Sequence, residues 1–128
     1  MSIGFNSSWR LNSTTTNGPL NLSVSTVSGR SSSPLTTFYN SRVGRDFLFV
    51  GISNNCQSTG VTGGCIRSLN ITTAFPTSGN LNSVILAADG GTSGITVDNN
   101  SGAGEASSVY YVTLTGNTLV KATQAALK

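Results

Sequence analysis

The sequence predicts an all-β fold, and three observations support this prediction. Short runs of Val, Ile, Leu, Phe and Tyr alternate with turn residues along the 128-residue chain, which is typical of strands joined by turns. Ser, Thr, Asn and Gly dominate the polar part, and only 9% of the residues are charged. Helix-forming composition is confined to the closing "KATQAALK", which is too short to stand alone as a helix. The length suits one core, so we expect a single β domain over 1–128.

The strand candidates follow one another at regular intervals. Residues 20–27 alternate between apolar and polar, and a second candidate, 35–40, follows Pro34. Residues 46–53 form the strongest apolar run, and we expect it to be buried on both faces. Gly116-Asn117 predicts a two-residue hairpin turn between the last two strands. The remaining candidates are 65–72, 82–88, 94–98, 108–115 and 118–124.

The chain also repeats itself with a period near 60 residues. Residues 11–24 match residues 69–85, and a second, weaker match sets Phe47 opposite Val109. A period near 60 that holds four short strands is typical of a long β-propeller blade. The sequence therefore predicts antiparallel sheets of the propeller-blade type.

About two blades' worth of sequence is present. One complete blade, 33–88, lies between two incomplete ones, 1–32 and 89–128. Each incomplete blade leaves unpaired strand edges, which are templates for association. One complete blade and two incomplete ones hold too few strands to close a propeller ring, so we expect homo-oligomerisation to complete the sheets.

Several motifs resemble a known family. The stretches "TTFYNSRVGRDFLFVGIS", "GGCIRSLNIT", "GGTSGITVDN", "SVYYVTL" and "KATQAALK" are similar, in order and spacing, to the C-terminal end of large, secreted, uncharacterised β-propeller proteins of soil bacteria. The resemblance covers roughly residues 33–128 and implies a fragment of a longer, secreted parent chain. It brings no established activity and no catalytic residues. The first 25 residues lack the features of a signal peptide.

The glycines of "GGTSGITVDN" have two interpretations. A phosphate cradle needs a helix after the glycines to supply converging N–H groups, whereas a β-branched strand is expected here. In the family interpretation, Gly90 and Gly91 make the crossing from one blade to the next, and Gly94 allows close packing near the central axis. We therefore favour the structural interpretation.

Two cysteines bracket a Gly-rich loop. Cys56 and Cys65 are nine positions apart, which suits a disulfide that closes a hairpin. A metal site would need two further soft ligands. The sequence therefore predicts a disulfide or structural thiols, depending on the compartment.

The chain has no histidine, so histidine-based catalysis and His-ligated zinc are excluded within one chain. The oxygen-rich cluster "DNNSGAGE" offers Asp98, Asn100 and Glu105 as ligands for Ca²⁺, Mg²⁺ or Mn²⁺. Such a site, gathered at an oligomer axis, could support a metal-dependent hydrolase promiscuous on phosphoesters, with Asp98 and Glu105 as its catalytic candidates. A solvated turn has the same composition, so we expect no cofactor.

Binding partners are constrained by charge and by aromatic residues. The net charge is +3, and the basic residues are scattered rather than clustered, so we expect no nucleic-acid partner. No apolar run is long enough to cross a membrane as a helix. Trp9 and Tyr110 could form a sugar platform; of the adjacent Tyr110 and Tyr111, one is expected in the core and the other exposed.

Three functions follow from these features. We expect a non-enzymatic structural or binding module that self-assembles through exposed strand edges. The metal-dependent hydrolase and a carbohydrate-binding module remain alternatives. The missing histidine excludes histidine-based mechanisms within one chain but leaves a carboxylate-based hydrolase as an alternative.

Overall fold

The computed structural model describes residues 32–56, 61, 63–73, 83–98 and 108–123. Every regular element in this part of the chain is a strand, and the all-β prediction is confirmed. Accordingly, no helix among these residues is long and apolar enough to cross a membrane. The strands are β1 (Thr36–Asn40), β2 (Arg45–Ile52), β3 (Cys65–Asn70), β4 (Ser83–Ala87), β5 (Thr96–Asp98), β6 (Ser108–Val112) and β7 (Leu119–Thr123).

The strands form two antiparallel sheets, a four-stranded sheet in the order β1-β2-β3-β4 and a three-stranded sheet in the order β5-β6-β7. Each sheet is a meander in which every strand pairs with the next one along the chain. The ends of these strands lie within three residues of the predicted ranges; the largest difference is at β6, which ends at Val112 rather than at 115. The predicted strand at 20–27 lies outside the described residues.

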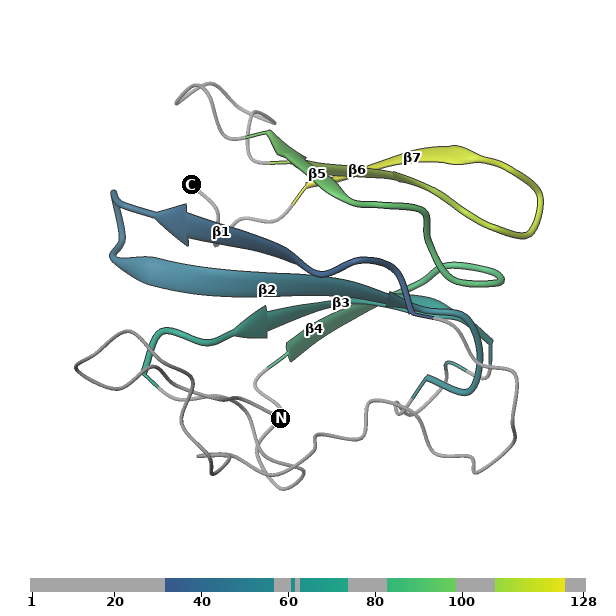
Figure 1. The fold of residues 1–128 in the computed structure, drawn as a ribbon, viewed down its shortest axis with the longest axis horizontal. Helices are drawn as coiled ribbons and strands as arrows, with labels where there is room; N and C mark the ends of the chain where they lie inside the picture. Colours follow the sequence, from purple (N-terminus) through teal and green to yellow (C-terminus); the bar gives the residue numbers. More distant parts are fainter. Residues whose placement is uncertain (1–31, 57–60, 62, 74–82, 99–107, 124–128) are drawn as a thin grey trace, which may run out of the picture.

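The two sheets pack face to face, with the three-stranded sheet over one side of the four-stranded sheet (Figure 1). Successive side chains of a strand point to opposite faces, so each sheet has two distinct surfaces. We call the surfaces that meet the inner faces. The other surface of the four-stranded sheet is its far face, and the other surface of the three-stranded sheet is its outer face.

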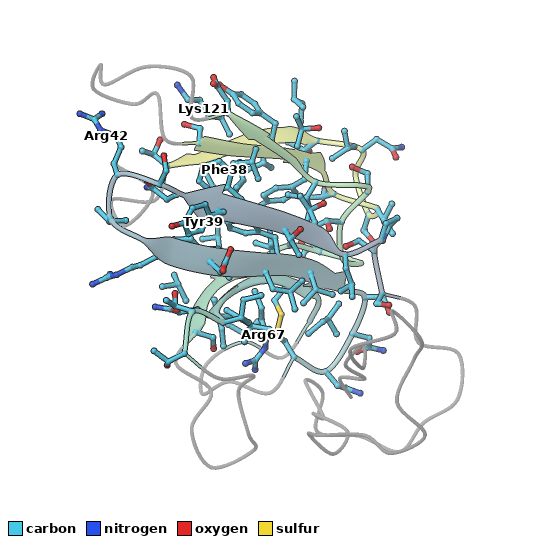
Figure 2. All side chains as sticks on the ribbon, turned by 60° about the vertical axis from the view of Figure 1, so that its left-hand side comes forward. Phe38, Tyr39, Arg42, Arg67 and Lys121 are labelled. Carbon is cyan, nitrogen blue, oxygen red and sulfur yellow. A yellow bond between two sulfur atoms is a disulfide. The ribbon has the colours of Figure 1, made fainter. Side chains whose placement is uncertain are left out.

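The main core lies between the inner faces. Phe47 and Phe49 of β2 contribute neighbouring rings, 6.4 Å apart between centroids, and Phe38 also lies between the sheets (Figure 2). The three-stranded sheet contributes Val109 and Tyr111 from β6. The buried cluster comprises Phe47, Phe49, Ile66, Ala88, Ile95, Val109 and Tyr111.

Strand β2 is buried on both faces, as its continuous apolar run predicted. All six residues from 47 to 52 are buried, and a second apolar cluster of Leu48, Val50 and Leu69 lies on the far face. No strand of the described residues lies over the far face. The two sides of β2 therefore belong to two separate clusters.

The junction between the sheets depends on close backbone approach. Gly90 and Gly91 have φ values of 74° and 89°, a region that favours glycine. A Cβ added to Gly91 would lie 2.8 Å from the Cα of Ser53. Gly90 and Gly91 therefore lie where the chain crosses from the four-stranded sheet to the three-stranded sheet. No helix follows them that could make a phosphate cradle.

The expectation for Gly94 is wrong, because this residue is exposed and a Cβ there would meet nothing within 4 Å. The close approach involves Gly51 and Gly64 instead. A Cβ on Gly51 would collide with the side chain of Thr92, and one on Gly64 would lie 2.7 Å from the carbonyl oxygen of Ser53. At Gly51 and Gly64, therefore, a residue without a Cβ is required because atoms of the following segment lie in the space that a Cβ would fill.

The β6–β7 connection is longer than expected. The N–H of Thr113 donates to the carbonyl of Thr118 at 2.9 Å, so four residues, 114–117, form the loop. Gly116 and Asn117 both have positive φ, at 85° and 50°. The predicted residues turn the chain, but they are the second half of a four-residue loop rather than a two-residue turn.

Candidate functional site

The acidic cluster is only partly described. Asp98 is the last residue of β5, half-buried, and its register partner is Ser108 of β6. Asn100 and Glu105 lie outside the described residues. Within the described ranges, no three His, Cys, Asp or Glu side chains gather in a way that could hold a metal ion. The metal and catalytic roles of Asp98 therefore stay predictions.

The two neighbouring tyrosines of β6 are divided as expected. Tyr111 is buried in the main core, where burial away from water raises the pKa of its phenol. Tyr110 is half-buried on the outer face, between its register partners Thr96 and Lys121. Lys121 marks the side of the sheet turned away from the core (Figure 2). Trp9, the other candidate for sugar stacking, lies outside the described residues.

The predicted disulfide is present. Cys56 and Cys65 are bonded, with their Cα atoms 5.9 Å apart. The bond joins the segment after β2 to the first residue of β3, and both cysteines are buried beside Ile52. It closes the loop between two central strands, which is a structural role and leaves neither thiol for metal binding or catalysis.

One cation is buried in a place that the scattered charge pattern did not indicate. Arg67 of β3 is fully buried on the far-face side of the sheet, near the disulfide (Figure 2). Its Nη1 donates to Ser83 Oγ at 3.2 Å, and burial lowers the pKa of its guanidinium. An Arg in the middle of a predicted strand, as in "CIRSLN", is the sequence signal for such a group.

Two serines make the same set of hydrogen bonds, one at the entrance to each sheet. The N–H of Ser33 donates to Gly51 O at 2.9 Å, and its Oγ accepts from Gly51 N at 2.8 Å. The N–H of Ser93 donates to Val112 O at 2.9 Å, and its Oγ accepts from Val112 N at 3.0 Å. Each Oγ also donates to the carbonyl of the following residue, at 2.9 Å in both cases.

These paired bonds define a structural repeat. Ser33 corresponds to Ser93, and Gly51 to Val112, so the strands that precede these partners also correspond. The register then sets Phe47 opposite Ser108 rather than opposite Val109. The sequence match was therefore one residue out. Phe47 and Val109 both lie in the core between the inner faces, but in the repeat the inner face of the four-stranded sheet corresponds to the outer face of the three-stranded sheet.

The repeat contains one pair with opposite environments. Leu35 follows Ser33 by two residues, as Ile95 follows Ser93. Ile95 is 6% exposed in the core between the sheets, whereas Leu35 is 66% exposed beside β1. The two side chains have equivalent places in the repeat, but within the described part of the chain only Ile95 has a sheet to pack against.

Other large apolar side chains are exposed at open positions. Leu119 of β7 is 71% exposed, the highest value for a large hydrophobic residue among those described. Val84 and Leu86 of β4 share the inner-face side with Ser68 and Ile66 but are exposed. Strands β4 and β7 have no further partner strand within the described part of the chain. The molecule thus presents open edges next to apolar surface.

Sequence reasoning missed this surface because exposure is not visible in a strand pattern. The similarity of "SSPLTT" to "TSGITV" is the signal that could have pointed to the pair of entrance segments. No family model, curated protein or solved structure matches the chain. Its function is therefore argued from its residues.

Proposed function

We propose that the chain is a non-enzymatic structural and binding module, a fragment of a β-propeller that self-assembles through exposed strand edges. The observation that carries this proposal is the repeat of the entrance segments, in which Ser33 and Ser93 make matching bonds to their sheets. One entrance residue is packed and its counterpart is exposed. A unit built by repetition, whose first described sheet has no neighbouring sheet before it among the described residues, is suited to association with further copies.

The arrangement of the sheets supports the propeller interpretation. Propeller blades are antiparallel meanders of four strands, and the β1-β2-β3-β4 sheet has this order. The β5-β6-β7 sheet has the order of a blade without its outermost strand. The entrance to the three-stranded sheet contacts the sheet before it in sequence, through Ile95 in the shared core and the hydrogen bond from Thr36 Oγ1, as serial stacking requires.

The open edges support self-association. An edge strand presents unpaired N–H and C=O groups that pair readily with another strand. Strands β4 and β7 are such edges among the described residues, and each carries exposed apolar side chains, Leu86 and Leu119. Apolar surface beside an open edge is stabilised when a second chain covers it.

The solution mass of the full chain tests this proposal. We expect size exclusion with light scattering to give one discrete oligomer, and the same mass after treatment with EDTA. A folded monomer over the whole accessible concentration range would contradict self-assembly. An oligomer that EDTA dissociates would contradict assembly through strand edges alone and would indicate a metal ion at the interface.

A further inference from the structure

The contact between the two sheets within one chain has identifiable parts. The entrance residue of the later sheet, Ile95, belongs to the same buried cluster as Phe49 and Ile66 on the inner face of the earlier sheet. Thr36 fixes the contact, because its Oγ1 donates to the carbonyl of Ile95 at 2.9 Å. An entrance residue on one side and a receiving face on the other thus form the contact.

Each part of this contact occurs a second time in the chain. Leu35 is the counterpart of Ile95 as an entrance residue. The register makes Tyr110 the counterpart of Phe49 and Leu119 the counterpart of Ile66, because Val112 pairs with Leu119 as Gly51 pairs with Ile66. Thr96 corresponds to Thr36 and pairs with Tyr110, as Thr36 pairs with Phe49.

The second set of parts lies on opposite sides of the molecule. Leu35 alternates with Thr36, whose partner Phe49 is on the inner face, so Leu35 lies on the far-face side of β1. Tyr110 and Leu119 lie on the outer face of the three-stranded sheet. One chain cannot bring these two surfaces together, because both of its sheets lie between them.

We propose that the outer face of the three-stranded sheet binds the far-face side of β1 in a second copy. In this contact Leu35 of the second copy lies against Tyr110 and Leu119. Thr96 Oγ1 of the first copy donates to the carbonyl of Leu35 of the second. The contact joins the two most exposed large hydrophobic side chains of the described residues, Leu119 at 71% and Leu35 at 66%.

This inference rests on the proposed self-assembly and specifies its geometry. The two contacting surfaces are different, so the interface is heterologous and runs head to tail. Such a contact closes into a ring or continues as a filament. A pair of identical surfaces facing each other, as in a simple two-fold dimer, does not bring Leu35 to Leu119.

The contact between copies differs from the one within the chain in one respect. Gly51 has no side chain and lies directly against Thr92, whereas its counterpart Val112 has one. The second interface is therefore held further apart at this end than the first. We expect it to be weaker than the junction within the chain and reversible on dilution.

Disulfide trapping between full-length variants tests the geometry. Leu35→Cys and Leu119→Cys are made as separate proteins, mixed under oxidising conditions and run on a non-reducing gel. Both positions are exposed, so the substitutions are compatible with folding. We expect the mixture to give a covalent dimer at several times the yield of either variant alone, and the double variant to give a ladder of higher species.

Val43→Cys is the matched control, because Val43 is 46% exposed in the turn between β1 and β2 and does not belong to the three-stranded sheet. Mixed with Leu35→Cys, it should give no excess of dimer. Preferred dimers of Leu35→Cys with itself would overturn the head-to-tail contact. If the chain is an oligomer by light scattering but the mixture gives no excess dimer, this inference fails and the proposed self-assembly stands. If the chain is a monomer, both fail.

A second measurement does not depend on thiol chemistry. Leu119→Asp and Leu35→Asp each place a charge in the proposed contact, and charges are costly to bury without a partner. We expect each variant to shift the light-scattering mass toward the monomer, whereas Val43→Asp leaves the mass unchanged. Equal masses for all three variants would overturn the assignment of this interface.

Discussion

The entrances to the two sheets have nearly the same local structure and opposite environments. Ser33 and Ser93 make matching hydrogen bonds to β2 and β6. Two residues later, however, Leu35 is exposed and Ile95 is buried in the core. The comparison teaches that the short-range sequence builds the entrance, while burial of its apolar residue depends on a neighbouring sheet. Among the described residues, no neighbouring sheet lies beside Leu35.

The two sheets also differ in how they are fixed internally. The four-stranded sheet has the Cys56–Cys65 bond and apolar side chains on both faces of β2. The three-stranded sheet has a four-residue loop between β6 and β7, and only its inner face belongs to a buried core. We infer that the four-stranded sheet is the more stable unit and that the three-stranded sheet depends on it for burial.

The largest effect should separate the counterparts Phe49 and Tyr110. Phe49 is 1% exposed in the main core, and Phe49→Ala should lower the free energy of unfolding by about 3–5 kcal/mol. Tyr110→Ala removes a half-buried ring from the outer face and should cost less than about 1 kcal/mol in the dissociated protomer. Urea unfolding at low protein concentration measures both. Equal losses would show that the outer face is as deeply packed as the inner one.

A smaller effect should separate Gly51 from Val112. A Cβ on Gly51 would lie 2.9 Å from the Cβ of Thr92, besides colliding with its hydroxyl. Gly51→Ala should therefore destabilise the chain by about 1–3 kcal/mol, as overpacking does. Val112→Ala should change the free energy of unfolding by less than about 1 kcal/mol, because Val112 is half-buried and its side chain is not pressed by the backbone. Thermal unfolding compares the two, and an unchanged Tm for Gly51→Ala would contradict the close approach.

The smallest effect should distinguish the two serines. Ser33→Ala leaves the buried N–H of Gly51 without its side-chain acceptor and should cost about 1–2 kcal/mol. Ser93→Ala affects the half-buried N–H of Val112, which water can reach more easily, and should cost about 0.5–1 kcal/mol. Amide hydrogen exchange at Gly51 and Val112 follows each loss separately. A larger fold increase in the exchange rate at Gly51 in the Ser33 variant than at Val112 in the Ser93 variant agrees with this order; the reverse contradicts it.

The sequence by itself determined the strands, the disulfide and the crossing glycines. Alternating apolar residues and turn residues are local signals, so the ranges around β1 to β7 could be predicted to within a few residues. Cys56 and Cys65 are close along the chain, and a disulfide needs only that their Cβ atoms approach. The positive φ at Gly90 and Gly91 is likewise a property of a few consecutive residues.

Only the tertiary structure decided which faces meet and which side chains are left exposed. A shift of one residue moves every side chain of a strand to the opposite face. The sequence repeat aligned Phe47 with Val109, whereas the hydrogen-bond register makes Ser108 the counterpart of Phe47, and only the structure shows this difference of one residue. Close approach at Gly51 depends on Thr92, 41 positions later in the chain. Leu35 and Leu119 are exposed because no further sheet of the described residues packs on them, and a short stretch of sequence does not contain this information.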